Sequence, residues 1–189
     1  MTRDLAKPGF LEEAIPEMEA VHRFALRLSG GSEDDAGDLV QETFLRAYRS
    51  WHTFIPGTDC RRWLFTICRN VFLRSRERQR PTVDLEDGEQ DAVAAGSVYA
   101  AAREKGYDDI YARLDLAPAL RDALDDLAEP FRSAVILVDV EDLSYESAAD
   151  VMGVPIGTVR SRLFRGRRLL QEKLVTVAED LGFQGAGTP

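Results

Sequence analysis

The sequence predicts an all-α protein, and three observations support this. Apolar residues recur at three- and four-residue steps through most of the chain, which is the period of an amphipathic helix. No stretch shows the strict apolar–polar alternation of a half-buried strand. Breaks containing glycine and proline divide the pattern into segments of helical length. We therefore expect two small helical domains, at residues 10–80 and 119–175, joined by an acidic linker at 81–118 and followed by a tail at 176–189.

The first domain should contain three main helices. The apolar stripe of the first helix consists of Ile15, Met18, Val21, Ala25 and Leu28. The pair Gly30-Gly31 ends it, and the pair Asp34-Asp35 favours the N-terminus of the second helix, where the helix dipole attracts negative charge. The turn at 56–58 separates that helix from a third, basic helix that begins near Cys60.

The linker and the second domain differ in composition. Residues 82–117 are acidic, rich in alanine and weakly periodic, so we expect a linker with one short helix near 94–105. Helical patterning resumes at Pro118, and the segment from 131 to 140 contains an apolar run that should be buried.

Residues 143–170 predict a helix-turn-helix. Ser144 can cap a short helix over 145–152 through its hydroxyl. Gly153 supplies the permissive residue after that helix, and Pro155 suits the first turn of the next one. On a helical wheel, one face of the second helix collects apolar and small residues: Val159, Leu163, Gly166 and Leu170. The opposite face collects Arg160, Ser161, Phe164, Arg165 and Arg168.

This outward face has the chemistry of a major-groove reader. Arginine can bond guanine with two hydrogen bonds, and an aromatic edge can contact a thymine methyl group. A solvated, charged helix surface is the alternative interpretation. The few acids on this helix and the turn chemistry before it favour DNA binding.

The net charge of −9 is unfavourable for a nucleic-acid binder only as an average. Residues 61–80 carry a local balance of +6, residues 156–173 one of +5, and residues 82–129 one of −9. Attraction to phosphate acts over about 8 Å at physiological salt. The two basic segments therefore decide the interaction with nucleic acid.

Metal, redox, membrane and enzyme functions find little support. The chain has two cysteines, Cys60 and Cys68, and two histidines, too few and too poorly spaced for a structural zinc site. On one helix the two thiols would be about 12 Å apart, beyond disulfide reach, so ordinary buried thiols are favoured over a redox pair. No apolar run suits a membrane span, and residues 1–10 do not resemble a secretory signal, so we expect a cytoplasmic protein without membrane insertion. No phosphate loop, nucleophile motif or metal cluster accompanies the carboxylates, so we expect no cofactor and no enzyme.

Three segments resemble a known family. Residues 143–149 (LSYESAA), 157–163 (GTVRSRL) and 165–167 (RGR) are similar to region 4 of the extracytoplasmic-function (ECF) sigma factors, members of the sigma-70 family. In that family the second helix of this motif reads the −35 promoter element. The resemblance implies that the following residues contact −35 DNA: Thr158, Arg160, Ser161, Phe164, Arg165 and Arg168.

Residues 38–48 (DLVQETFLRAY) resemble region 2.2 of the same family, which docks on the β′ clamp helices of RNA polymerase. The polar side chains beside Leu45 also suit a helix-pair interface, although an ordinary surface helix would have the same pattern. The resemblance implies that the polymerase-binding residues are Asp38, Leu39, Gln41, Glu42 and Leu45.

Residues 60–70 (CRRWLFTICRN) resemble region 2.4. This implies that Arg61, Arg62, Trp63, Arg69 and Asn70 contact the −10 element, and that the loop at 55–59 holds a flipped base. Trp51, Phe54, Trp63 and Phe65 interleave with these arginines, as in a single-strand stacking platform. Trp63 shares an apolar stripe with Ile67 and Val71, so a core position is equally open to it.

The resemblance implies a sigma factor whose partners are core RNA polymerase (the β′ clamp helices and the β flap), promoter DNA and an anti-sigma factor. It also implies that the genes controlled by this factor form a stress-response regulon. Residues 52–58 and 165–168 are similar to the group that answers thiol-oxidative stress. The rival hypothesis is a helix-turn-helix repressor or activator that acts without polymerase. That rival explains residues 119–175 but not the segments at 38–48 and 60–70.

Overall fold

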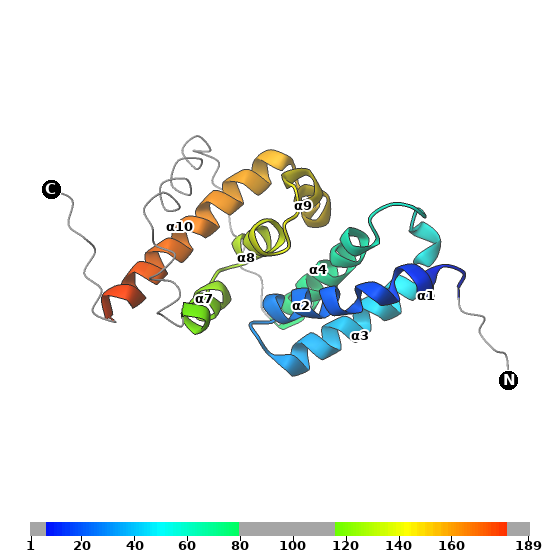
Figure 1. The fold of residues 1–189 in the computed structure, drawn as a ribbon, viewed down its shortest axis with the longest axis horizontal. Helices are drawn as coiled ribbons and strands as arrows, with labels where there is room; N and C mark the ends of the chain where they lie inside the picture. Colours follow the sequence, from blue (N-terminus) through cyan, green and yellow to red (C-terminus); the bar gives the residue numbers. More distant parts are fainter. Residues whose placement is uncertain (1–6, 80–115, 181–189) are drawn as a thin grey trace.

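The computed structural model describes residues 7–79 and 116–180. In these two ranges the chain forms helices and no strand, which confirms the all-α prediction. The described residues form two helical bundles, one from each range (Figure 1). The predicted linker helix near 94–105 and the last nine residues of the predicted tail lie outside the described residues.

The N-terminal bundle is built around three helices that pack on one another in pairs. Its elements are α1 (Phe10–Glu13), η1 (Ile15–Glu17), α2 (Met18–Leu28), α3 (Glu33–Arg49), η2 (Trp51–Thr53) and α4 (Cys60–Gln79). Gly30 and Gly31 have positive φ angles between α2 and α3, as the predicted break requires. The Ser32 hydroxyl then accepts the Asp35 N–H at 3.3 Å and caps α3. Asp59 caps α4 in the same way through the N–H of Arg62 at 3.0 Å.

The C-terminal bundle contains the predicted helix-turn-helix. Its elements are α7 (Leu116–Asp125), α8 (Phe131–Val135), the π-helical turn η3 (Ile136–Val140), α9 (Tyr145–Met152) and α10 (Ile156–Asp180). The Ser144 hydroxyl accepts the Ser147 N–H at 3.1 Å, and Gly153 adopts the left-handed conformation with φ 66°. Both capping predictions are confirmed.

The inner face of α10 packs tightly on α8. Val159, Leu163, Gly166 and Leu170 are buried, as the helical wheel predicts. A Cβ atom on Gly166 would lie 2.8 Å from the Val135 side chain and 3.2 Å from the Phe131 carbonyl oxygen. Glycine at this position therefore sets how closely α10 approaches α8.

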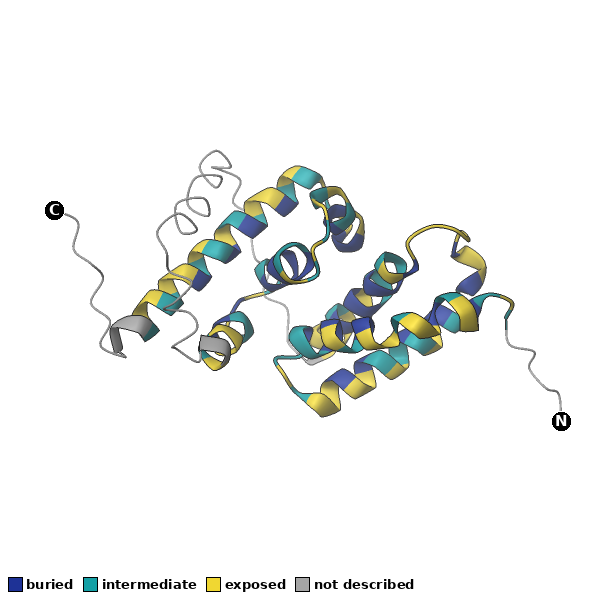
Figure 2. Ribbon diagram, viewed as in Figure 1, coloured by how far each residue is buried: buried dark blue, intermediate teal, exposed yellow. Residues whose placement is uncertain are grey.

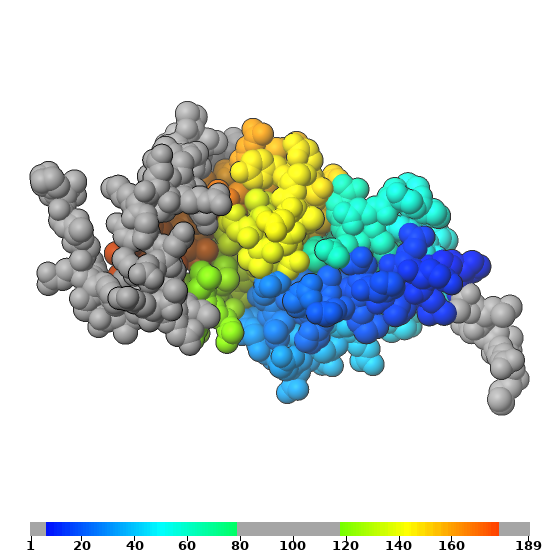
Figure 3. Space-filling view, in the orientation of Figure 1, coloured from blue at the N-terminus to red at the C-terminus, as the bar shows by residue number. Residues whose placement is uncertain are grey.

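The two bundles pack against each other, mainly through α4 and α9. In Figure 3, atoms of the N-terminal bundle lie directly against atoms of the C-terminal bundle. Buried residues line the inward sides of the helices, and exposed residues follow the outward sides (Figure 2). No helix among the described residues is both long and apolar enough to span a bilayer.

Candidate nucleic-acid interface

The outer side of α10 carries all six residues predicted to contact the −35 element. Arg160, Ser161, Arg165 and Arg168 are exposed, and Thr158 and Phe164 are half-buried. The structure therefore brings this whole set together on one solvent-facing side of a single helix.

Two of these arginines lie over aromatic rings of neighbouring helices. The Arg160 guanidinium is 5.6 Å from the centre of the Tyr145 ring on α9, and the Arg165 guanidinium is 5.2 Å from the Phe131 ring on α8. Such cation–π contacts restrict the side chain without using its hydrogen-bond donors. The donors of both arginines thus remain available to base edges or phosphates.

The residues predicted to contact the −10 element are placed differently, although all lie on α4. Asn70 is exposed. Arg61 donates to Glu17 at 2.6 Å, and Arg62 donates across the bundles to Asp150 at 3.2 Å. Arg69 is only 6% exposed, because it is enclosed between α4 and the C-terminal bundle. The packed arrangement does not present Arg69 to DNA.

The predicted aromatic platform for single-stranded DNA is wrong for three of its four rings. Phe65 is fully buried and stacks on Phe24 at 4.4 Å, so it is a core residue. Trp51 and Phe54 are buried and stack on each other at 4.6 Å. Trp63 is half-buried and contacts both of these rings, so it combines a packing role with partial exposure. The prediction failed because aromatic residues interleaved with arginine also occur where a helix has one core face and one basic face.

Four of the residues predicted to bind polymerase lie along one accessible face of α3. These are Asp38, Gln41, Glu42 and Leu45, and Leu45 is 43% exposed. Leu39 is buried in the N-terminal bundle, so it holds α3 in place and does not lie on this surface. Arg46 donates to Glu42 at 2.5 Å and orients that carboxylate on this face.

Comparison with known proteins identifies the family. The family Sigma-70 region 2 matches residues 17–82, and the family Sigma-70, region 4 matches residues 118–170. The ECF sigma factor EcfG of Rhodopseudomonas palustris is 39% identical over 170 residues, covering 89% of this chain and 86% of that protein. The chain belongs to the ECF sigma factors. The prediction of this family is confirmed, whereas the thiol-oxidative-stress group stays a prediction.

Other relatives of this sigma factor give the same result. SigE of Mycolicibacterium smegmatis is 40% identical over 170 residues, which cover 89% of this chain but only 63% of SigE. The sigma factor RpoE of Bartonella quintana, solved with the anti-sigma factor NepR, is 34% identical, with a TM-score of 0.62 over 88% of this chain and 96% of that one. CnrH, solved with the cytosolic domain of CnrY, is 25% identical, with a TM-score of 0.59 and 88% coverage of both chains.

Sequence reasoning missed the polar residues that join the two bundles of this sigma factor. Arg132 is 6% exposed and Ser133 is fully buried, and both lie at the start of the apolar run. A lone arginine at the start of a buried run was the available signal, because a buried charge requires a partner. The cysteines agree with expectation, since both are buried on α4. Burial raises the pKa of Cys60 to about 11 and that of Cys68 to about 12.

Proposed function

We propose that this sigma factor binds core RNA polymerase and directs promoter-specific initiation by recognising −10 and −35 elements. One observation carries the proposal. The residues matching the family's −35 motif form a single exposed face on α10, while the opposite face of that helix is packed into the bundle. A helix so mounted can enter the major groove without unfolding its domain. Because core polymerase and promoter DNA are in the cytoplasm, this protein would act there as well.

Polymerase binding is assigned to the exposed face of α3. That face lies on the outside of the N-terminal bundle and combines two carboxylates, an amide and one exposed leucine. Such a surface suits a basic partner helix through charge complementarity around an apolar contact, and we assign it to the β′ clamp helices. The C-terminal bundle contacts the β flap.

Recognition of the −10 element is assigned to α4 and to the loop before it. Asn70 and the loop tip at Ile55, which is 68% exposed, are accessible in the packed arrangement. Arg69 becomes accessible only after the two bundles separate, because it is buried and bonded to the C-terminal bundle, whereas Arg62 pairs with Asp150 at an exposed position. Promoter recognition at two elements therefore requires an open form.

We further propose that an anti-sigma factor silences this protein until stress releases it. RpoE of Bartonella quintana was solved in complex with the anti-sigma factor NepR, and CnrH was solved in complex with the cytosolic domain of CnrY. A compact form that already withholds the −10 residue Arg69 is a suitable target for an inhibitor.

Reconstituted run-off transcription tests the proposal. Core polymerase plus the purified chain and a promoter library should give transcripts that start at defined positions downstream of shared −35 and −10 sequences. Core polymerase alone should not select these sites. Absence of start-site selection with the chain present would refute the proposal.

A gel shift without polymerase addresses the rival hypothesis. The isolated sigma factor should bind promoter DNA poorly, with an affinity that falls steeply with salt, because phosphate contacts dominate. Tight, sequence-specific binding by the chain alone would favour a helix-turn-helix regulator that acts without polymerase.

A further inference from the structure

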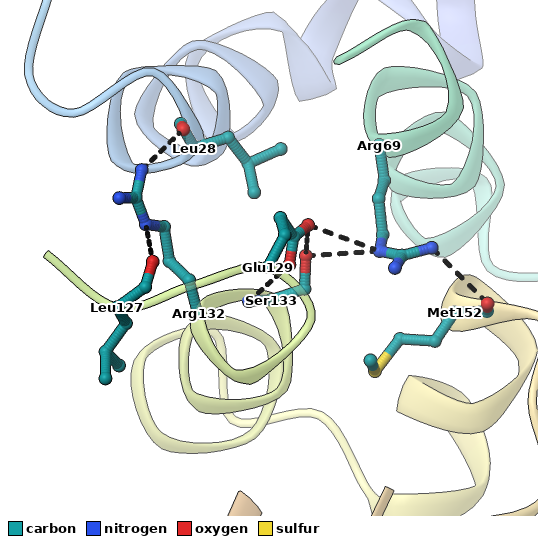
Figure 4. A network of polar contacts seen from close by, with 7 residues as sticks. All are labelled: Leu28, Arg69, Leu127, Glu129, Arg132, Ser133 and Met152. Atoms are coloured by element: carbon teal, nitrogen blue, oxygen red, sulfur yellow. Dashed lines mark hydrogen bonds and ion pairs between the residues drawn. The ribbon is translucent and has the colours of Figure 1, made fainter. Parts of the chain in front are cut away.

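Two arginines are buried where the bundles meet, and each reaches the end of a helix in the other bundle (Figure 4). Arg69 on α4 donates through Nη1 to the carbonyl of Met152 at 3.3 Å, and Met152 is the last residue of α9. Arg132 on α8 donates through Nη1 to the carbonyl of Leu28 at 3.1 Å, and Leu28 is the last residue of α2. The bundles thus exchange one arginine each.

Helix C-termini are suitable acceptors for such arginines. The last four carbonyls of a helix have no partner within the helix, and the helix dipole places partial negative charge there. A guanidinium supplies both hydrogen-bond donors and positive charge. Burial lowers the pKa of Arg69 and of Arg132, but arginine starts so far above neutrality that both stay charged.

Further contacts orient both side chains. Arg69 Nε donates to the Ser133 hydroxyl at 3.1 Å, and that hydroxyl donates in turn to the Glu129 carboxylate, which lies 3.9 Å from Arg69 Nε. Arg132 Nε donates within its own bundle to the Leu127 carbonyl at 3.2 Å. Each guanidinium is therefore held from two sides, and neither can withdraw without leaving a buried carbonyl unsatisfied.

Two ion pairs flank this network. Arg27 on α2 pairs with Glu141, whose pKa is raised by burial, and Arg62 on α4 pairs with the exposed Asp150. The Arg62–Asp150 pair is exposed, and exposed ion pairs contribute little to an interface. Glu141 is enclosed, so its pair with Arg27 adds to closure beside the exchange of the two buried arginines.

We propose that Arg69 and Arg132 form a reciprocal latch that holds the two bundles closed in the unbound chain. The latch withholds Arg69 from promoter DNA, a consequence that rests on the proposed function. Arg69 cannot bond Met152 and DNA at the same time, so opening the latch is a required step before the −10 element is bound.

Cooperative unfolding tests the latch without polymerase or DNA. Both tryptophans of the chain, Trp51 and Trp63, lie in the N-terminal bundle, so their fluorescence follows that bundle alone. Amide signals of α9 and α10 in ¹⁵N-labelled protein follow the C-terminal bundle. In wild-type protein the two urea midpoints should coincide, because latched bundles unfold as one unit.

The variant Arg132→Met keeps an unbranched side chain but loses the donors. Its two urea midpoints should separate by about 0.5–1 M, which is the effect of losing a hydrogen bond to a charged group at ordinary urea dependence. The control Arg23→Met removes an exposed arginine of α2 that pairs within its own helix, so its midpoints should still coincide.

A second variant, Arg69→Met, removes the other cross-bundle arginine of the latch and provides the test if Arg132→Met does not fold. In ¹⁵N relaxation of the full chain, wild-type bundles should share one rotational correlation time, and both variants should give two shorter ones. Separate midpoints or separate tumbling in wild-type protein would refute the latch. So would coincident midpoints and shared tumbling in the folded variants. If the latch is correct but the sigma function is not, these results stand while run-off transcription fails.

Discussion

Helices α4 and α10 both carry many arginines, but the structure employs them differently. On α10, the exposed Arg160 and Arg165 lie over aromatic rings and leave their hydrogen-bond donors available. On α4, Arg61, Arg62 and Arg69 each bond an acceptor from another element. Both segments attract phosphate by composition. The difference teaches that local charge indicates which helix suits DNA, whereas packing decides whether that helix is available before its partner binds.

Substitution of Gly166 by a larger residue tests whether α10 has one tightly packed side and one exposed side. In Gly166→Val the added carbons must push against Val135 and the Phe131 carbonyl, so the free energy of unfolding of the chain should fall by about 2–3 kcal/mol. Urea unfolding measures this. The control Gly157→Ala has open space around its new Cβ and should be neutral or stabilising by up to about 1 kcal/mol. Equal effects at both positions would contradict the close approach of α8 and α10.

The outward side of α10 is tested by Arg165→Ala. Loss of a bidentate base contact should cost about 1–3 kcal/mol at one base pair and relax −35 specificity there. Run-off transcription from −35 variants measures the change. Phe131→Leu, which removes only the ring beneath Arg165, should give a smaller effect at the same base pair, whereas Phe131→Tyr should retain discrimination. An unchanged −35 profile in Arg165→Ala would show that the reading face is misassigned.

The outer face of α3 extends the comparison to a helix whose carboxylates are already accessible. Charge reversal in Asp38→Lys or Glu42→Lys should weaken binding to core polymerase by about fivefold, on the order of 1 kcal/mol, while the fold is retained. Titration of labelled sigma factor with core enzyme measures the affinity. Glu19→Lys reverses an exposed charge on α2, outside this face, and should leave the affinity unchanged. Unchanged binding in both α3 variants would remove α3 from the interface.

The inward side of α4 gives the smallest expected change. The thiolate is the reactive form of cysteine, and burial raises the pKa of Cys60 to about 11 and that of Cys68 to about 12. At pH 7–8 both thiols are therefore protonated, and mild oxidant or alkylating agent should leave polymerase binding unaltered. Alkylation should become fast only in urea. Rapid labelling of the native chain, followed by mass spectrometry, would contradict this placement.

Local chemistry made much of the fold predictable. Ser144 and Gly153 carry the cap and turn signals of the helix-turn-helix, and these depend only on residues close in sequence. The buried side of α10 was predictable because Val159, Leu163 and Leu170 repeat at helical spacing. The matching reading face followed from the same wheel.

Contacts between distant segments were not predictable in the same way. Arg69 and Met152 are far apart in sequence, and a bond from a side chain to a carbonyl leaves no periodic pattern. The inward direction of Leu39, by contrast, could be found in the sequence, because Ala36, Leu39, Thr43 and Ala47 repeat at helical spacing and all four are buried. The prediction for Phe65 was wrong because α4 has both a basic side and a core side, and Phe65 lies on the core side.

The length of α10 has a mechanical consequence. Twenty-five residues at 1.5 Å each make a rod of about 37 Å, with the reading arginines toward one end and Lys173 bonded to Asp126 beyond α7 at the other. Arg167 also bonds Asp139 of η3, which ties the middle of the rod to its bundle. A stiff rod cannot shorten or bend to follow a promoter whose two elements are spaced differently. Any tolerance for spacer length must therefore arise outside the C-terminal bundle.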